Sequence, residues 1–132
     1  MRSETRRDSR LFGELVRTLL QAGHSARFRA EGRSMFPAIA NGEVVQVNPL
    51  TLGSRRGEVV MTESVDGFRI HRVIPSRADT IDTRGDCCLE ADAAGAIVGS
   101  VSLLDSGTAR PVPSLRAGAV LRRWLARWRG HF

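Results

Sequence analysis

The first clear pattern along the chain is a helical stripe of apolar side chains within residues 9–22. Apolar residues recur there at spacings of three and four, which places them on one face of an α-helix. Asp8 or Ser9 can cap the start of this helix, and Gly23 is placed to end it. The stripe consists of Leu11, Phe12, Leu15, Val16, Leu19 and Leu20. We therefore expect residues 1–25 to form an N-terminal helix that packs on the rest of the protein.

The segments that follow are shorter, and their composition favours β-strands. They are rich in Val, Ile and Thr, alternate in polarity, and are separated by turn residues. Asp66-Gly67 is a tight hairpin signal, and Gly99 marks a bulge or a close approach of two backbones. The expected strands are residues 26–30, 43–47, 57–63, 68–74, 80–83 and 96–104. The sequence thus predicts a mainly β domain over residues 26–105.

The last part of the chain, residues 106–132, is expected to form a linker and a basic amphipathic helix. Within it, residues 115–128 carry an apolar stripe surrounded by arginines. The stripe consists of Leu121, Trp124, Leu125 and Trp128. Two interpretations stay open, since such a helix can lie on an anionic membrane surface or pack on the β domain with its arginines in solvent.

Composition is typical of one ordinary globular domain. The chain has 132 residues, 42% of them hydrophobic, with 20 basic against 14 acidic residues and a net charge of +6. All 20 of these basic residues are arginines, and they gather near the two ends, so the charge describes the termini more than the middle. The sequence contains no helix-turn-helix or zinc-ligand pattern, and its aromatic residues are not interleaved with arginines in strands. We therefore expect no nucleic-acid partner; the oligomeric state stays open.

The sequence carries no pattern typical of a membrane span or a secretory signal. No stretch approaches the roughly 18–20 continuous apolar residues that a span needs, and Glu14 and Arg17 interrupt the first apolar segment. Cys87 and Cys88 are adjacent, and Cα atoms about 3.8 Å apart are too close for an ordinary disulfide, so both are expected to be reduced. These features predict a cytoplasmic protein, with residues 115–132 as a candidate for peripheral attachment to the inner face of the membrane.

The chemistry that the sequence suggests centres on Ser34. Gly32 and Pro37 flank it and constrain its backbone, which favours a turn that can present a hydroxyl; a capping or turn serine is the alternative. A serine nucleophile needs a base, and the chain has no lysine to supply one. His71 is the only histidine in an expected core strand, and Asp86 and Asp92 follow around the next turn. These residue types are those of a serine hydrolase.

At these positions the sequence resembles the type I signal peptidase family. Residues 32–37 (GRSMFP) are similar to its G-x-S-M-x-P nucleophile box, and residues 71–74 (HRVI) to the H-R-V-I box of its endoplasmic-reticulum and archaeal branch. Residues 83–86 (TRGD) are similar to its T-K-G-D box, after which Asp92 falls at the place of the catalytic aspartate. Weaker similarities lie at residues 42–43, 57–60 and 97–99. The resemblance covers residues 30–104, and the family's fold also occurs in self-cleaving repressors of the DNA-damage response.

The resemblance implies a compact signal-peptidase-like or repressor-like β domain between the two helices. It implies that Ser34 is the nucleophile, His71 the general base and Asp92 the residue that orients it. Asp86 would hold the turn, with a second role near His71, so the choice of orienting carboxylate stays open. Substrate-binding or oxyanion roles are expected in the turn, at Gly32, Arg33 and Met35. No metal and no cofactor is implied.

The sequence therefore predicts a serine endopeptidase of the signal-peptidase-like class. The resemblance implies cleavage after a small residue, with the substrate extended along a strand edge. That substrate would be a leader peptide or a dedicated partner protein. The alternative is a non-catalytic peptide- or membrane-binding module on the same fold. A self-processing repressor fragment is a further alternative.

Overall fold

The computed structural model describes residues 2–50, 56–65, 67–75, 81–93 and 95–114, with side chains from residue 9 onward. One helix and seven strands follow one another in these residues. The helix, α1, spans Arg2–Gln21 and therefore begins earlier than the apolar stripe alone predicts. The strands are β1 (Ala26–Arg29), β2 (Val44–Asn48), β3 (Val59–Ser64), β4 (Gly67–Ile74), β5 (Asp82–Arg84), β6 (Ala96–Asp105) and β7 (Thr108–Pro111). The prediction of a mainly β fold is confirmed, whereas the predicted C-terminal helix lies outside the described residues.

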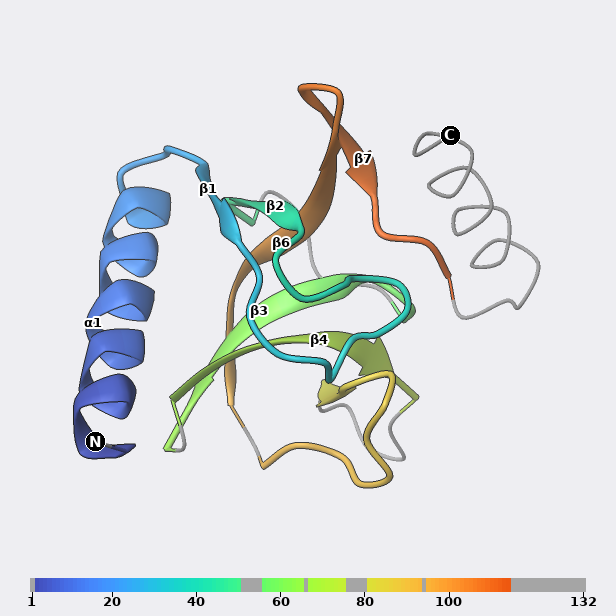
Figure 1. Ribbon diagram of the computed structural model, residues 1–132, viewed down its shortest axis with the longest axis horizontal. Coiled ribbons are helices and arrows are strands. Elements are labelled where there is room, and N and C mark those ends of the chain that lie inside the picture. The colour runs from blue at the N-terminus through green and yellow to red at the C-terminus, as the bar shows by residue number, and fades with distance from the viewer. Residues whose placement is uncertain (1, 51–55, 66, 76–80, 94, 115–132) are drawn as a thin grey trace.

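The strands form one antiparallel sheet in the order β1-β2-β6-β3-β4-β5, with β7 paired to the end of β6. The long strand β6 joins the two halves of the sheet, because its first part pairs with β3 and its later part with β2 and β7 (Figure 1). Among the described residues β1 pairs with β2 alone, so one edge of β1 is open. This open edge leads directly into the loop that contains Ser34.

A hairpin joins β6 and β7. The sequence predicted residues 106–132 as a linker followed by a helix, yet within them Thr108–Pro111 pairs with the end of β6. Ser106 and Gly107 form the turn, with φ angles of 50° and 83°. Two consecutive left-handed residues are typical of the two-residue turns that fit the twist of a hairpin. The sheet therefore extends past residue 105.

Helix α1 stands beside the sheet and packs on it through one face (Figure 1). Val16 and Leu20 are buried in the core, as the helical stripe predicts, but Leu11 and Leu15 remain more than half exposed. The sheet contributes the alternating buried residues of β2, β3 and β6 to the same core. The core residues are Val16, Leu20, Ala26, Ala30, Met35, Ile39, Val45, Val47, Val59, Met61, Val101 and Leu103.

Gly99 lies at a close approach of β6 to β2 and α1. A Cβ atom at this position would be 2.6 Å from the Asn48 carbonyl oxygen and 2.9 Å from a Leu20 methyl group, so no larger residue fits without a shift. The pairing of β3 with β6 also changes register beside it, between Met61 and Thr62. The glycine therefore serves both purposes expected of it, a close approach and a local irregularity.

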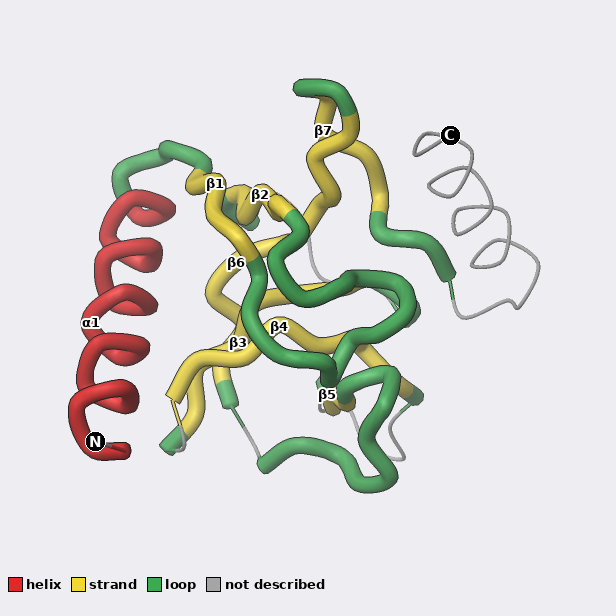
Figure 2. Tube along the Cα trace, in the orientation of Figure 1, coloured by secondary structure: helices red, strands yellow, loops and turns green. Residues whose placement is uncertain are grey.

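Two long loops carry the polar chemistry of the molecule. Residues 30–43 connect β1 to β2, and residues 85–95 connect β5 to β6 (Figure 2). The Cys87 N–H donates a hydrogen bond of 2.8 Å to the Ser34 carbonyl, which joins the two loops. The fold thus brings Ser34 next to the segment that holds both candidate aspartates.

Candidate active site

Ser34 lies on a tight turn that is anchored on both sides. Gly32 has a φ of +92°, a conformation that other residues rarely adopt, and its N–H donates to Asn41 Oδ1 at 2.9 Å. The turn's own backbone hydrogen bonds run from the Phe36 N–H to Arg33 and from the Ile39 N–H to Met35. Within the described part of the chain, these bonds leave the N–H of Ser34 uncommitted.

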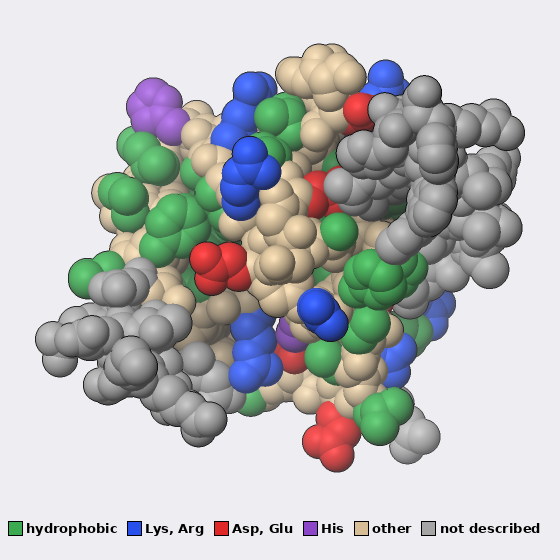
Figure 3. Space-filling view, viewed as in Figure 1, with side chains coloured by type: hydrophobic (Ala, Val, Ile, Leu, Met, Phe, Trp, Pro, Cys, Tyr) green, Lys and Arg blue, Asp and Glu red, His purple; other side chains and the backbone are tan. Residues whose placement is uncertain are grey.

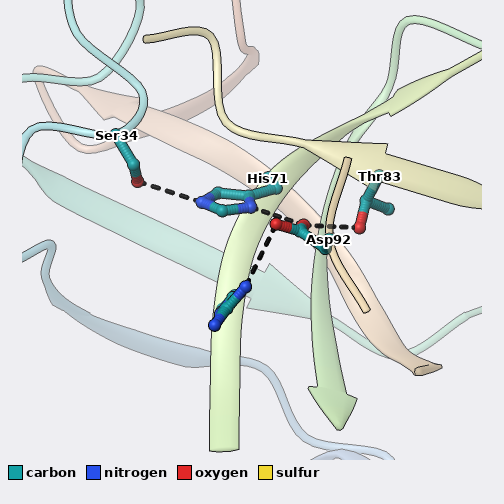
Figure 4. A network of polar contacts seen from close by, with 5 residues as sticks. Ser34, His71, Thr83 and Asp92 are labelled. Carbon is teal, nitrogen blue, oxygen red and sulfur yellow. Dashed lines mark hydrogen bonds and ion pairs between the residues drawn. The ribbon is translucent and has the colours of Figure 1, made fainter. Parts of the chain in front are cut away.

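The Ser34 hydroxyl faces the imidazole of His71. Ser34 Oγ and His71 Nε2 are 3.1 Å apart, which is hydrogen-bond distance (Figure 4). His71 comes from the middle of β4 and is only 6% exposed, so its ring is held by the sheet. The sequence predicted these two residues as nucleophile and base, and the fold places them in contact across 37 positions of sequence.

Asp92 completes a row of three side chains. Its Oδ2 lies 2.5 Å from His71 Nδ1, on the side of the ring away from Ser34. A carboxylate can only accept, so Nδ1 carries the hydrogen and the neutral ring offers Nε2 as the acceptor for the Ser34 hydroxyl. This is the arrangement of a nucleophile, a base and an orienting carboxylate.

Two further side chains hold Asp92 in place. The Thr83 hydroxyl donates to Asp92 Oδ2 at 2.7 Å, and Arg69 Nη1 donates to Oδ1 at 3.2 Å. The backbone also helps, because the Asp92 N–H donates to the Thr83 carbonyl at 2.8 Å. Both oxygens of the carboxylate are therefore bound, and its side chain is only 7% exposed.

These contacts keep Asp92 ionised. Burial raises the pKa of the Asp92 carboxyl, but the hydrogen bonds from His71, Thr83 and Arg69 and the attraction to His71 outweigh it. The net result is a pKa below the ordinary value of an aspartate. A negative charge next to His71 is suited to stabilising an imidazolium when the ring takes up a proton.

Asp86 does not contact His71, although the sequence left open whether it orients the imidazole. Its partner is Arg72. It accepts two hydrogen bonds of 2.9 Å from Arg72, one at each oxygen, and its side chain is 2% exposed. Arg72 also donates to the carbonyls of Gly57 and Pro113. Asp86 therefore holds the 85–95 loop to β4, and the structure places Asp92, not Asp86, on the imidazole.

Gly85 is the point where the two loops and β4 meet. A Cβ atom there would lie 2.8 Å from the Ser34 carbonyl oxygen, 3.0 Å from His71 Nε2 and 2.7 Å from Cys88 Sγ. Only glycine leaves room for this junction. Cys87 adds a second link, because its thiol donates to the Phe36 carbonyl at 2.9 Å. The short distance between Ser34 and His71 thus depends on the absence of a side chain at Gly85.

The three side chains open into a cleft of about 1410 Å³. Its walls come from α1, β1, β4 and the loops 30–43 and 85–95. Ser34, His71 and Asp92 all line it, so the cleft gives solvent and ligands access to the serine.

On the face in Figure 3, the described arginines lie in separate groups among apolar and acidic side chains.

The turn residues predicted to bind substrate fall in three different environments. Gly32 lines the cleft, but its N–H is bound to Asn41, so it does not supply a free oxyanion donor. Met35 lines the cleft and is also part of the core, with 4% of its surface exposed. Arg33 is exposed and is not part of the cleft lining.

Sequence reasoning missed Arg69 and Thr83 as members of this site. A signal for Arg69 was present, because alternation along β4 places it on the same face as His71. Thr83 was identified as part of a motif, yet nothing in its spacing indicated a contact with Asp92. Both contacts depend on how the 85–95 loop folds back onto β5.

The described residues contain no group of three or more His, Cys, Asp and Glu side chains that could hold a metal ion. None of the helical structure in that part of the chain has the length and apolar character needed to cross a bilayer. Comparison of the whole chain with models of protein families, with curated proteins and with solved structures finds no match.

Proposed function

We propose that this protein is a serine endopeptidase of the signal-peptidase-like class. One observation carries the proposal: Ser34, His71 and Asp92 lie in a row at 3.1 and 2.5 Å, and the serine faces an open cleft. The motif resemblance at residues 32–37, 71–74 and 83–86 supports the same class independently of the geometry. Both lines favour hydrolysis of a peptide bond over a non-catalytic role.

Acylation would begin with proton transfer from Ser34 Oγ to His71 Nε2. The oxygen then attacks the substrate carbonyl carbon, and the imidazolium gives the proton to the leaving amine. Asp92 stabilises the imidazolium and keeps Nδ1 protonated, so that Nε2 stays available as the base. The uncommitted N–H of Ser34 is suited to donate to the developing oxyanion.

Deacylation would reverse the roles. A water molecule entering from the cleft gives a proton to His71 Nε2 and attacks the acyl-enzyme, after which Ser34 leaves with the proton. No metal or cofactor takes part in either half of this scheme. The Gly32 N–H is not a second oxyanion donor, because it is bound to Asn41.

The open edge of β1 suggests how a substrate would lie. An extended peptide can add to an exposed strand edge through backbone hydrogen bonds, and β1 leads directly to the Ser34 turn. The family that the motifs resemble cleaves after small side chains. We therefore propose a small residue before the cleaved bond, in a leader peptide or a dedicated partner protein.

The site's chemistry can be tested without knowing the substrate. A fluorophosphonate probe reacts with activated serines, so the native protein should be labelled and the Ser34→Ala variant should not. Mass spectrometry of the labelled peptide would locate the adduct. Equal labelling of the two proteins would rule out Ser34 as the nucleophile, and absence of labelling in both would favour a binding module that retains the fold.

The substrate itself requires a different experiment. A cell lysate is incubated in parallel with the native protein and with Ser34→Ala, and new peptide termini are compared by mass spectrometry. Termini that appear only with the native protein identify the cleaved bond. A small residue on the amino side of that bond would agree with the proposal, whereas large or charged residues there would contradict it.

A further inference from the structure

The cleft that Ser34 lines is also lined by three aromatic rings, Phe12 of α1, Phe28 of β1 and Phe68 of β4, which we call the aromatic cluster. Phe12 and Phe28 meet edge to face, with ring centroids 4.9 Å apart and planes at 84°. Phe12 is nevertheless 43% exposed, and it lines the cleft. The cluster is therefore an apolar surface on the same cavity as Ser34.

The position of α1 against the cleft is fixed by close packing. A Cβ atom on Gly13 would lie 2.1 Å from the Phe68 ring, so the helix reaches this distance only because residue 13 is glycine. Arg17 adds an ion pair with Glu63, and its guanidinium carbon lies 6.0 Å from the centre of the Phe68 ring. Phe12, one residue from Gly13, is thereby held at the wall of the cleft.

The cleft is large enough for one ligand to contact both Ser34 and this wall. Its volume of about 1410 Å³ exceeds the roughly 300–1,000 Å³ of sites that hold one small ligand. Phe28 precedes Ser34 by six residues, a span of at most about 20 Å in an extended chain. A peptide bound along β1 with its cleaved bond at Ser34 would pass the aromatic cluster within about six residues.

We propose that Phe12, Phe28 and Phe68 form a subsite that selects a large apolar side chain, of the Phe or Leu class, in the peptide substrate. The proposal rests on the proposed peptidase function and adds a second determinant to the small residue at the cleaved bond. Helix α1 then has a direct role in substrate choice, because it supplies Phe12. A large apolar side chain is favoured here because it removes the exposed ring from water.

The test uses short peptides built from Ala, Ser and Gln around a central alanine. Each peptide carries one Phe, and the position of this Phe, before or after the alanine, differs from peptide to peptide. Mass spectrometry locates the cleaved bond, and kcat/KM is measured for each peptide. We expect one Phe position to raise kcat/KM by about tenfold or more over the peptide without Phe. This ratio should fall strongly in Phe12→Ala and be largely kept in Phe12→Leu.

Leu11→Ala is the matched control, because Leu11 is an exposed apolar residue of the same helix that does not line the cleft. Its ratio should equal that of the native protein. The aromatic subsite would be excluded if no Phe position raised kcat/KM, or if Phe12→Ala kept the full ratio. An equal fall in Leu11→Ala and Phe12→Ala would likewise exclude it, since it would point to the helix as a whole.

A binding measurement separates failure of the subsite from failure of the peptidase. Fluorescein-labelled versions of the same peptides are titrated with Ser34→Ala protein, with and without Phe12→Ala, and anisotropy is recorded. If a Phe-bearing peptide binds more tightly than the peptide without Phe, and Phe12→Ala abolishes this difference, the subsite is supported. If nothing is cleaved in that case, only the peptidase proposal fails. Cleavage with no Phe preference in either measurement would overturn the subsite and leave the peptidase standing.

Discussion

His71 and Arg72 are neighbours on β4, and both are buried, with 6% and 3% of their surface exposed. Each bonds an aspartate from the loop that follows β5, His71 to Asp92 and Arg72 to Asp86. Alternation along the strand sends the two side chains to opposite faces of the sheet. The same strand thus carries two consecutive buried residues that each bind an aspartate, and they have different surroundings.

The Arg72 site is closed. Its guanidinium donates to both Asp86 oxygens at 2.9 Å, to the Gly57 carbonyl at 2.9 Å and to the Pro113 carbonyl at 2.8 Å. Every one of these acceptors belongs to the protein, and the pair is almost completely buried. Such a bidentate, fully enclosed pair fixes loops to a sheet and has no group left to react with a ligand.

The His71 site is open at one end. Asp92 binds one ring nitrogen, while the other faces the Ser34 hydroxyl at the wall of the cleft. The network therefore ends on a group that can exchange its proton with a substrate. The comparison teaches that a buried polar residue is a candidate for catalysis when its network stays incomplete toward a cavity, and for structure when the network closes.

The largest expected effect is the loss of labelling activity when the open site loses its histidine. His71→Ala removes the base, so we expect the rate of fluorophosphonate labelling to fall by about 10⁶-fold, the scale on which serine hydrolases lose activity without their histidine. The circular dichroism spectrum should stay native, which controls for folding. Labelling within about tenfold of the native rate would show that Ser34 does not depend on His71.

Asp92→Asn should have the next largest effect. An amide can donate to Nδ1, which leaves Nε2 protonated and unable to accept the Ser34 proton, and it cannot balance an imidazolium. We expect the labelling rate to fall by about 10⁴-fold while the protein stays folded. A rate equal to that of the native protein would mean that Asp92 positions the loop without supporting the base.

Arg72→Ala should instead act on stability. It leaves the Asp86 carboxylate buried without its partner, and removing one member of a buried pair costs about 3–5 kcal/mol. Urea denaturation, monitored by far-ultraviolet circular dichroism, would measure this loss in the free energy of unfolding. Arg17→Ala is the control, since its ion pair with Glu63 is 37% and 28% exposed, and we expect less than about 1 kcal/mol there. Comparable losses in the two variants would mean that the enclosed Arg72 pair stabilises the fold no more than a partly exposed pair does.

Much of the fold follows from local patterns. The stripe of α1 predicted that Val16 and Leu20 would be buried, and the β-branched segments predicted six strands at nearly the observed positions. The strand β7 was missed because its residues, Thr108–Pro111, are all exposed and carry no large apolar side chain on either face. Its only signal was Ser106-Gly107, a pair that can adopt two left-handed conformations in succession.

The site was less accessible to sequence reasoning than the fold. The missing lysine and the strand position directed attention to His71, but the distance to Ser34 depends on two loops that meet through long-range bonds. The choice between Asp86 and Asp92 had the same difficulty, because both lie in one loop and no periodicity applies there. Side-chain contacts of irregular segments follow from tertiary packing, which residue spacing does not encode.

Arg69 gives a smaller test of the open site. Its guanidinium donates to Asp92 Oδ1 at 3.2 Å and is 37% exposed, so its contact with the catalytic row is through the carboxylate. We expect Arg69→Gln to lower the labelling rate by about 10- to 100-fold, in line with the loss of other supporting contacts. Arg69→Lys should recover part of the rate. If both variants label like the native protein, Thr83 and the backbone suffice to hold Asp92.

The smallest expected effect is on stability in acid. Because the native contacts lower the pKa of Asp92, its ionised form stabilises the folded protein above the ordinary aspartate pKa of about 3.9. That contribution is lost as the pH falls below about 4 toward the lower native pKa, since the carboxyl group then protonates in both states. Asp92→Asn should therefore be less stable than the native protein at neutral pH, by a margin that shrinks in acid.

Urea midpoints measured from neutral pH to about pH 3 would follow this margin. Asp105→Asn controls for the loss of one carboxylate, because Asp105 is exposed and pairs loosely with Arg110 at 3.6 Å. A margin for Asp92→Asn that is constant with pH, or that grows in acid, would mean that the contacts with His71, Thr83 and Arg69 do not favour the ionised form. Asp92 would still be ionised at neutral pH, but its network would not be what favours that charge.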